Sequence, residues 1–119
     1  MKIRFLATGS SPNVYSIQDG TINNIDLSPL EHGGKFIGDD ETQAAGIRDA
    51  ERDESGELWV TLCQAVGPGH WVESDWIDAS AYDPNAIYVV YLDKLHSGKP
   101  WAVTARGKVD PRTGEVVGV

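Results

Sequence analysis

The stretch Glu57–Val66, ELWVTLCQAV, decides the fold, because its side chains alternate between two faces with the two-residue period of a β-strand. The residues before it, DESG at 53–56, have the composition of a turn. We therefore expect the segment 45–52, AGIRDAER, to form a hairpin with 57–64. One face of the second strand would carry Leu58, Val60 and Leu62, and the other Trp59, Thr61 and Cys63.

The residues immediately upstream, 39–55, allow two interpretations. Ala, Gln, Glu and Arg in this segment favour a helix. However, Gly46 lies in the middle, and Ala45, Ile47 and Ala50 do not sustain a helical apolar stripe. The hairpin is the preferred prediction, and a short helix is the alternative.

Toward the N-terminus, the pattern predicts three short antiparallel strands. Residues 1–9 alternate, with Ile3, Phe5 and Ala7 on one side, and end in the turn 9–12. Residues 14–17, VYSI, form the second strand. Asp19-Gly20 is a hairpin signal that leads into the third strand at 21–27.

Two smaller features follow this N-terminal region. Ser28 could cap one helical turn that begins at Pro29, with Glu31 at its third position and a stop at 33–34. A brief strand is expected at 35–38, KFIG.

The C-terminal half contains the most apolar run of the chain, 87–93, IYVVYLD. Its β-branched and aromatic composition predicts a central strand buried on both faces. Beyond it, two β-rich runs at 101–109 and 115–119 flank the turn 110–114, DPRTG, which predicts a second hairpin.

Together these patterns predict a mainly β fold (a β-rich α+β class): a single compact domain, 1–119, of short antiparallel strands and hairpins with one or two short helical turns. No internal repeat or linker divides the chain. The expected core consists of Phe5, Ile25, Leu58, Val60, Leu62, Ile87, Val89, Tyr91 and Trp101.

Composition narrows the functional classes. A net charge of −8 argues against general nucleic-acid binding, because neutralising phosphates requires clustered Lys and Arg. Eight acids lie between Asp39 and Glu57, which is typical of a solvated face. A single cysteine and the lack of an apolar run long enough for a membrane span or a signal peptide indicate an intracellular protein without a membrane partner.

The stretch 67–83 gathers the candidate site residues. A single histidine among scattered carboxylates matches no zinc pattern, and the segment 73–83 lacks the glycine of a calcium loop, so we expect no metal. Aromatic rings beside carboxylates instead suggest a protein-contact surface, although the same rings could simply extend the core. A contact surface requires that one of the two tryptophans be exposed; we expect the other to be core. The candidates are His70, Trp71, Glu73, Asp75, Trp76 and Asp78.

No arrangement of residues calls for catalysis. Cys63 falls within a strand, where a lone cysteine is typically a small buried hydrophobe. His32, His70 and His96 lie in glycine-rich loops without a flanking catalytic motif, and neither EHGGKFIG nor HSGKPW has the spacing of a phosphate-binding loop. The sequence therefore predicts a non-enzyme with no catalytic residues and no cofactor.

Three motifs carry a resemblance to a known group of proteins. Asp26-Leu27-Ser28, Gly46-Ile47-Arg48-Asp49 and the segment 56–62, GELWVTL, resemble small proteins encoded in the tail modules of tailed bacteriophages and prophages. The resemblance covers roughly half the chain. It implies an accessory role in tail assembly, in the cytoplasm of the bacterial host or on the virion, and carries over no catalytic residue.

Two functions are consistent with these observations. The first is a phage or prophage tail accessory or assembly protein that acts through protein–protein contacts with tail components. The alternative is an acidic inhibitor or decoy that occupies a basic, nucleic-acid-binding surface of a host protein, with the acids of 39–57 supplying the charge.

Overall fold

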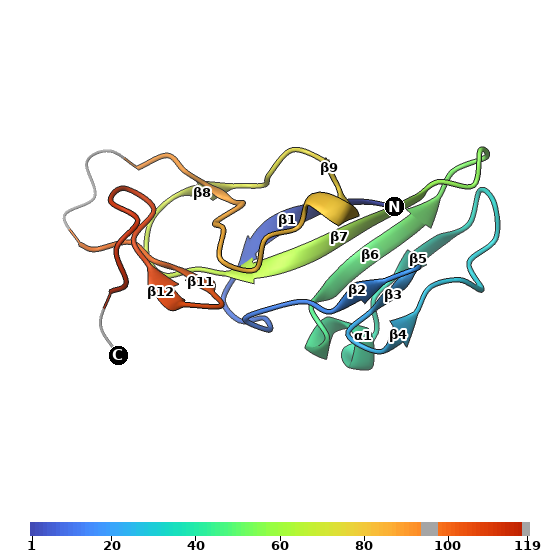
Figure 1. Ribbon diagram of the computed structural model, residues 1–119, viewed down its shortest axis with the longest axis horizontal. Helices are drawn as coiled ribbons and strands as arrows, with labels where there is room; N and C mark the ends of the chain where they lie inside the picture. The colour runs from blue at the N-terminus through green and yellow to red at the C-terminus, as the bar shows by residue number, and fades with distance from the viewer. Residues whose placement is uncertain (94–97, 118–119) are drawn as a thin grey trace.

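A five-stranded sheet forms the frame of the molecule, as the computed structural model shows for residues 1–93 and 98–117 (Figure 1). The prediction of a mainly β domain of short strands with little helix is confirmed. The long strand predicted from ELWVTLCQAV lies in the middle of the sheet. In spatial order the strands are β5 (Lys35–Ile37), β6 (Ile47–Arg52), β7 (Leu58–Ala65), β1 (Lys2–Thr8) and β9 (Ile77–Asp78).

The ambiguous segment 39–55 contains both structures that its sequence allowed. β6 pairs antiparallel with β7, so the preferred hairpin is confirmed. Ahead of it, α1 (Asp40–Ala44) forms one short helix, with Asp39 as its N-cap accepting from the Thr42 amide. Gly46, at φ +88°, ends the helix in the left-handed conformation and turns the chain into β6.

The pairing of β1 differs from the expectation of three antiparallel N-terminal strands. β1 runs parallel to β7, in a register from Lys2 opposite Trp59 to Thr8 opposite Ala65. The alternation read from the sequence is right, because Ile3 and Phe5 are buried. Parallel neighbours require a long crossover, and the chain between 9 and 57 supplies it.

The N-terminal hairpin is confirmed, but it belongs to a separate three-stranded meander. β2 (Ile17–Gln18), β3 (Thr21–Ile22) and β4 (Ile25–Asp26) pair in order. Asp19-Gly20 and Asn23-Asn24 both have positive φ, which is the backbone of the tight turns that join such strands. The prediction of one strand over 21–27 was therefore wrong, because two asparagines that tolerate the left-handed region fold it back on itself.

The helical turn predicted after Ser28 does not form. The Asp26 carboxylate accepts from the Ser28 amide at 2.9 Å, and the Leu30 amide donates to the Leu27 carbonyl at 3.1 Å. These bonds close a tight turn instead of starting a helix. The brief strand predicted at 35–38 is confirmed as β5.

The apolar run 87–93 was wrongly predicted to be a central strand. Only β10 (Val90–Tyr91) is a strand, paired with β8 (Trp71–Val72) in a small ribbon, and Val90 and Leu92 are exposed. The cause is Gln64 of β7, whose side-chain oxygen accepts from the amides of both Tyr88 and Val89. Those two donors are consequently satisfied by a side chain and not by a neighbouring strand.

The C-terminal hairpin lies earlier than predicted. The run 101–109 folds on itself as β11 (Ala102–Thr104) and β12 (Gly107–Val109), because the glycine at the start of β12 adopts φ +99° after a two-residue turn. The predicted turn at 110–114 is also present, but it supports only a single bridge between Val109 and Val116. One 3-10 turn, η1 (Ala79–Ala81), completes the described structure.

The core lies between one face of the sheet and the segments that cover it, the meander and residues 79–89. Phe5 is central, stacked on Tyr88 at 4.7 Å and edge-on to Tyr15 at 5.9 Å. Five predicted core residues are buried, namely Phe5, Leu58, Val60, Leu62 and Val89. Ile25 and Ile87 pack against them half-buried, whereas Tyr91 and Trp101 lie half-buried outside this cluster, in the part of the molecule that holds β8 and β10 to β12.

No helix in residues 1–93 and 98–117 combines the length and the apolar character that crossing a membrane requires.

Candidate functional site

The face of the sheet opposite the core carries large and charged side chains. Because paired residues share a face, the register places Arg4 beside Thr61, Glu51 beside Trp59, and Lys35 beside Glu51. We call this side of β5, β6, β7 and β1 the outer sheet face. Its alternation with the core residues is the one that the sequence of β7 predicted.

Three residues form the centre of the outer sheet face, and we call them the indole cluster: Arg4, Trp59 and Trp76. The two indoles meet edge to face, with centroids 5.1 Å apart and an interplanar angle of 88°. The Arg4 guanidinium lies 4.7 Å from the Trp76 ring centroid and donates from Nε to the Thr61 hydroxyl at 3.0 Å. The cation–π and edge-to-face contacts hold both rings in fixed orientations.

Trp76 is 38 % exposed, although Arg4 and Trp59 both pack against its ring. It stands between two hollows of the surface, of about 590 and 530 Å³, each of which is lined by Arg4 and Trp76. The first hollow lies toward the segment 71–75 and includes Glu73 and Asp75. The second lies over β5 to β7 and includes Asp49. The arrangement is an aromatic ridge held in place by its neighbours, with a depression that contains carboxylates on each side.

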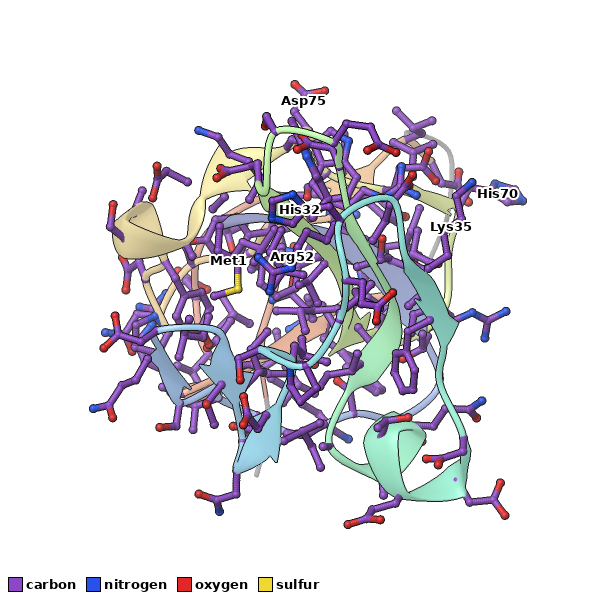
Figure 2. All side chains as sticks on the ribbon, turned by 90° about the vertical axis from the view of Figure 1, so that its right-hand side faces the viewer. Met1, His32, Lys35, Arg52, His70 and Asp75 are labelled. Carbon is purple, nitrogen blue, oxygen red and sulfur yellow. The ribbon has the colours of Figure 1, made fainter. Side chains whose placement is uncertain are left out.

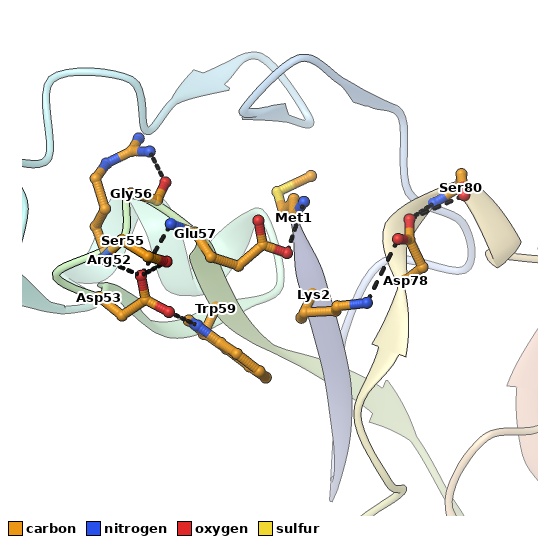
Figure 3. Close-up of polar contacts among 10 residues, drawn as sticks. All are labelled: Met1, Lys2, Arg52, Asp53, Ser55, Gly56, Glu57, Trp59, Asp78 and Ser80. Carbon is orange, nitrogen blue, oxygen red and sulfur yellow. Dashed lines mark hydrogen bonds and ion pairs between the residues drawn. The ribbon is translucent and has the colours of Figure 1, made fainter.

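Asp53 fixes the other indole from the β6–β7 turn (Figure 3). Its carboxylate accepts from Trp59 Nε1 at 2.8 Å, from the Ser55 hydroxyl at 2.6 Å and amide at 2.9 Å, and from the Glu57 amide at 3.0 Å. Hydrogen bonds from Ser55 and Trp59 favour the ionised form and lower the pKa of Asp53 from 3.8 to about 2. The turn chemistry predicted from DESG thus also orients a ring of the site.

This lowered pKa gives a pH-dependence of stability. The unfolded chain binds a proton at Asp53 at higher pH than the folded protein does, so the stabilisation is complete above about pH 4 and is lost as the pH falls toward 2. We expect the denaturant midpoint to fall across this window. In an Asp53→Asn variant that part of the slope should vanish, while the part due to Asp78, whose pKa is also about 2, remains. Parallel curves for wild type and variant would contradict the role of Asp53.

The six residues predicted from the stretch 67–83 do not form one surface. Glu73, Asp75 and Trp76 line the first hollow of the outer sheet face, and Trp76 also lines the second. His70 is 85 % exposed, with Nδ1 3.5 Å from an Asp93 oxygen, and Figure 2 shows His70 and Asp75 pointing away from the ribbon.

The other two predicted residues have structural partners. Trp71 packs its ring 5.1 Å from that of Tyr91 and donates from Nε1 to the Gly67 carbonyl, so that only part of it reaches the first hollow. Asp78 accepts from the Ser80 amide and hydroxyl, which lowers its pKa, and pairs with Lys2 at 3.5 Å. Asp78 therefore serves the turn at η1.

Sequence reasoning missed Arg4, Trp59 and Asp49 as site residues. The alternation of apolar residues puts Trp59 and Arg4 on the faces of their strands that point away from the core. That placement is the only indication in the sequence that these two side chains could belong to a surface site. Their proximity to Trp76 depends on β1 lying between β7 and β9. A local pattern contains no information on that order.

A larger hollow, about 1140 Å³, lies elsewhere, beside Met1 and between the meander and the β6–β7 turn. Its charged groups other than Asp19 already have partners within the fold. The Arg52 guanidinium donates to the carbonyls of Leu30, Gly56 and Leu27, and Glu57 lies 3.4 Å from the N-terminal amine. Size alone does not make this hollow a binding site. The indole cluster is the better candidate, because it exposes the ring of Trp76.

Cys63 is buried, and that burial raises the pKa of its thiol, which disfavours the nucleophilic thiolate. Among residues 1–93 and 98–117, no three His, Cys, Asp or Glu side chains are grouped as metal ligands would be. His96 and Ser97, the first two residues of the motif HSGKPW, lie outside the described residues.

No family model, curated protein or solved structure matches the chain.

Proposed function

We propose that this protein is a non-enzymatic binding protein that contacts a protein partner through the indole cluster. The resemblance of its sequence motifs to tail-module proteins suggests the setting: an accessory or assembly role with phage or prophage tail components in the bacterial cytoplasm, or on the virion. The proposal for the surface rests on geometry, and the proposal for the setting rests on that resemblance.

The proposal is carried by one observation: the Trp76 ring is partly exposed and yet held in a fixed orientation. An indole held by a cation on its face and a second ring at its edge has little conformational freedom to lose on binding. Tryptophan and arginine are the residue types that most often supply binding energy in protein interfaces. A large, partly exposed and immobilised Trp is therefore a ready-made anchor.

The alternative, an acidic decoy, has less support from the geometry. A decoy needs an array of free carboxylates over 39–57, but several of these acids have other partners. Asp39 caps α1, Asp53 is held within the turn, Glu51 pairs with Lys35 at 3.8 Å, and Glu57 pairs with the N-terminal amine. The remaining acids do not form one continuous array.

The Trp76→Ala variant tests the proposed function. Loss of an interface anchor should weaken partner binding by about 2 kcal/mol or more, roughly thirtyfold, whereas loss of the contacts with Arg4 and Trp59 should lower the free energy of unfolding by only about 1 to 2 kcal/mol and leave the protein folded. The tagged protein is expressed in the bacterium that carries its gene, and proteins retained by wild type and variant are compared by quantitative mass spectrometry.

Val116→Ala is the matched control, because Val116 is an exposed apolar residue away from the indole cluster. We expect tail structural proteins to be retained by wild type and by Val116→Ala and lost with Trp76→Ala. Equal retention by all three proteins would overturn the assignment of the surface. Retention of a protein other than a tail component, lost with Trp76→Ala, would keep the surface and overturn the setting.

A further inference from the structure

The outer sheet face carries three carboxylates that the fold does not use. Within residues 1–93 and 98–117, the side chains of Asp49, Glu73 and Asp75 take part in no hydrogen bond or ion pair, whereas Asp53 nearby is fully engaged. All three line the hollows beside Trp76, Asp49 in the second and the other two in the first. The exposed indole is therefore flanked on both sides by uncompensated negative charge.

The cations that line the hollows do not neutralise this charge. Lys35 lines the second hollow and pairs there with Glu51 at 3.8 Å. Arg4 is held on the Trp76 ring and on the Thr61 hydroxyl, and no carboxylate of residues 1–93 and 98–117 lies within ion-pair distance of it. The stacked Arg4 also demonstrates that an indole of this face accepts a guanidinium as a neighbour.

We propose that the occupant of this face is an extended basic segment of a partner protein, with cationic side chains that enter the hollows on both sides of Trp76. This inference rests on the proposed function and specifies the chemistry of its partner. Alternate residues of an extended chain point the same way, about 7 Å apart, so a segment that crosses the indole ridge can place one cation in each hollow. The aliphatic stems of the two cationic side chains contact the ring between the hollows.

Charge complementarity separates this partner from other classes. A nucleic acid or an acidic peptide would meet three free carboxylates on a chain of net charge −8. A basic segment satisfies the same carboxylates, and it approaches faster because the field of the whole protein attracts it.

The test uses the full chain and two synthetic pentapeptides with blocked ends, Lys-Val-Lys-Val-Lys and its glutamate counterpart. Binding is followed by the NMR shifts of the four indole N–H groups at about 0.1 M ionic strength, where the Debye length is about 10 Å. We expect the lysine peptide to shift the Trp76 signal most, followed by Trp59, and the glutamate peptide to shift neither. Trp76→Ala should abolish saturable binding.

A variant without the three carboxylates tests directly whether their charge attracts the peptide. Neutralising Asp49→Asn, Glu73→Gln and Asp75→Asn together should weaken the lysine peptide about tenfold, since three exposed pairs are lost, with an unchanged melting temperature. The control neutralises three exposed carboxylates outside both hollows, Glu31, Glu41 and Glu115, to glutamine. It should leave binding within about twofold of wild type, because charges beyond a Debye length are largely screened.

The outcomes distinguish this inference from the proposed function. Equal weakening by the two triple variants, or equal binding of both peptides, would overturn the basic-segment inference, because attraction would then be diffuse. If Trp76→Ala still loses its cellular partner in that case, the proposed function stands. If the lysine peptide binds as inferred but the cellular partner is retained by Trp76→Ala, the proposed function fails.

Discussion

Replacing Gln64 by leucine should lower the free energy of unfolding by about 4 kcal/mol. Gln64 is only 6 % exposed, and its side chain makes four hydrogen bonds. The oxygen accepts from the amides of Tyr88 and Val89 at 2.9 and 3.2 Å, and the nitrogen donates to the carbonyls of Ala86 and Val103, both at 3.2 Å. Leucine has a similar volume but leaves all four backbone groups unsatisfied, at about 1 kcal/mol or more each.

Chemical denaturation followed by circular dichroism measures the loss, with Gln43→Leu as the control. Gln43 is exposed and makes one hydrogen bond, to the Gly38 carbonyl, so its replacement should cost less than about 1 kcal/mol. Equal, small losses for the two variants would contradict the account, because residues 86–89 would then be held by apolar packing alone.

Gly46→Ala should also be strongly destabilising, by about 3 kcal/mol or more. The residue adopts φ +88°, which a side chain disfavours, and a Cβ there would collide with the buried Tyr15 ring and hydroxyl. That hydroxyl donates to the Cys63 carbonyl, so the ring cannot move without breaking a buried hydrogen bond. Backbone strain and overpacking therefore act together.

Gly114→Ala separates the two causes. Gly114 has a similar positive φ of +76°, but a Cβ there meets nothing within 4 Å, so this variant reports the backbone strain alone, about 1 kcal/mol. Thermal or denaturant unfolding of both variants gives the comparison. A loss at Gly46 no larger than that at Gly114 would mean that Tyr15 can shift at little cost.

Local patterns predicted the elements that depend on local chemistry. The β6–β7 hairpin follows from alternation and a turn sequence, and the Asp19-Gly20 turn follows from residues that tolerate positive φ. The prediction of a central strand over 87–93 was wrong because the structure of this run depends on hydrogen bonds with Gln64. Gln64 is a polar residue on the face of β7 where the alternation predicts an apolar one. A polar residue at such a position is a signal that another segment needs its hydrogen bonds.

Long-range pairing could not be predicted in the same way. Arg4 and Thr61 are 57 positions apart, and only the parallel pairing of β1 with β7 brings them into contact. The candidate site could be predicted only in part for the same reason, because it too depends on long-range strand pairing. The sequence indicated Trp76 and the carboxylates around it, but the partners that immobilise its ring come from β1 and β7.

The central claim is that the partner contacts the indole cluster. Cross-saturation NMR on labelled protein in complex with the purified partner from the capture experiment tests it most directly. We predict that saturation is transferred to the indole N–H of Trp76, and to a smaller extent to Trp59, while the exposed side chains of Val90 and Leu92, which line neither hollow, are unaffected. Transfer to Val90 and Leu92, with the Trp76 signal unchanged, would contradict the account.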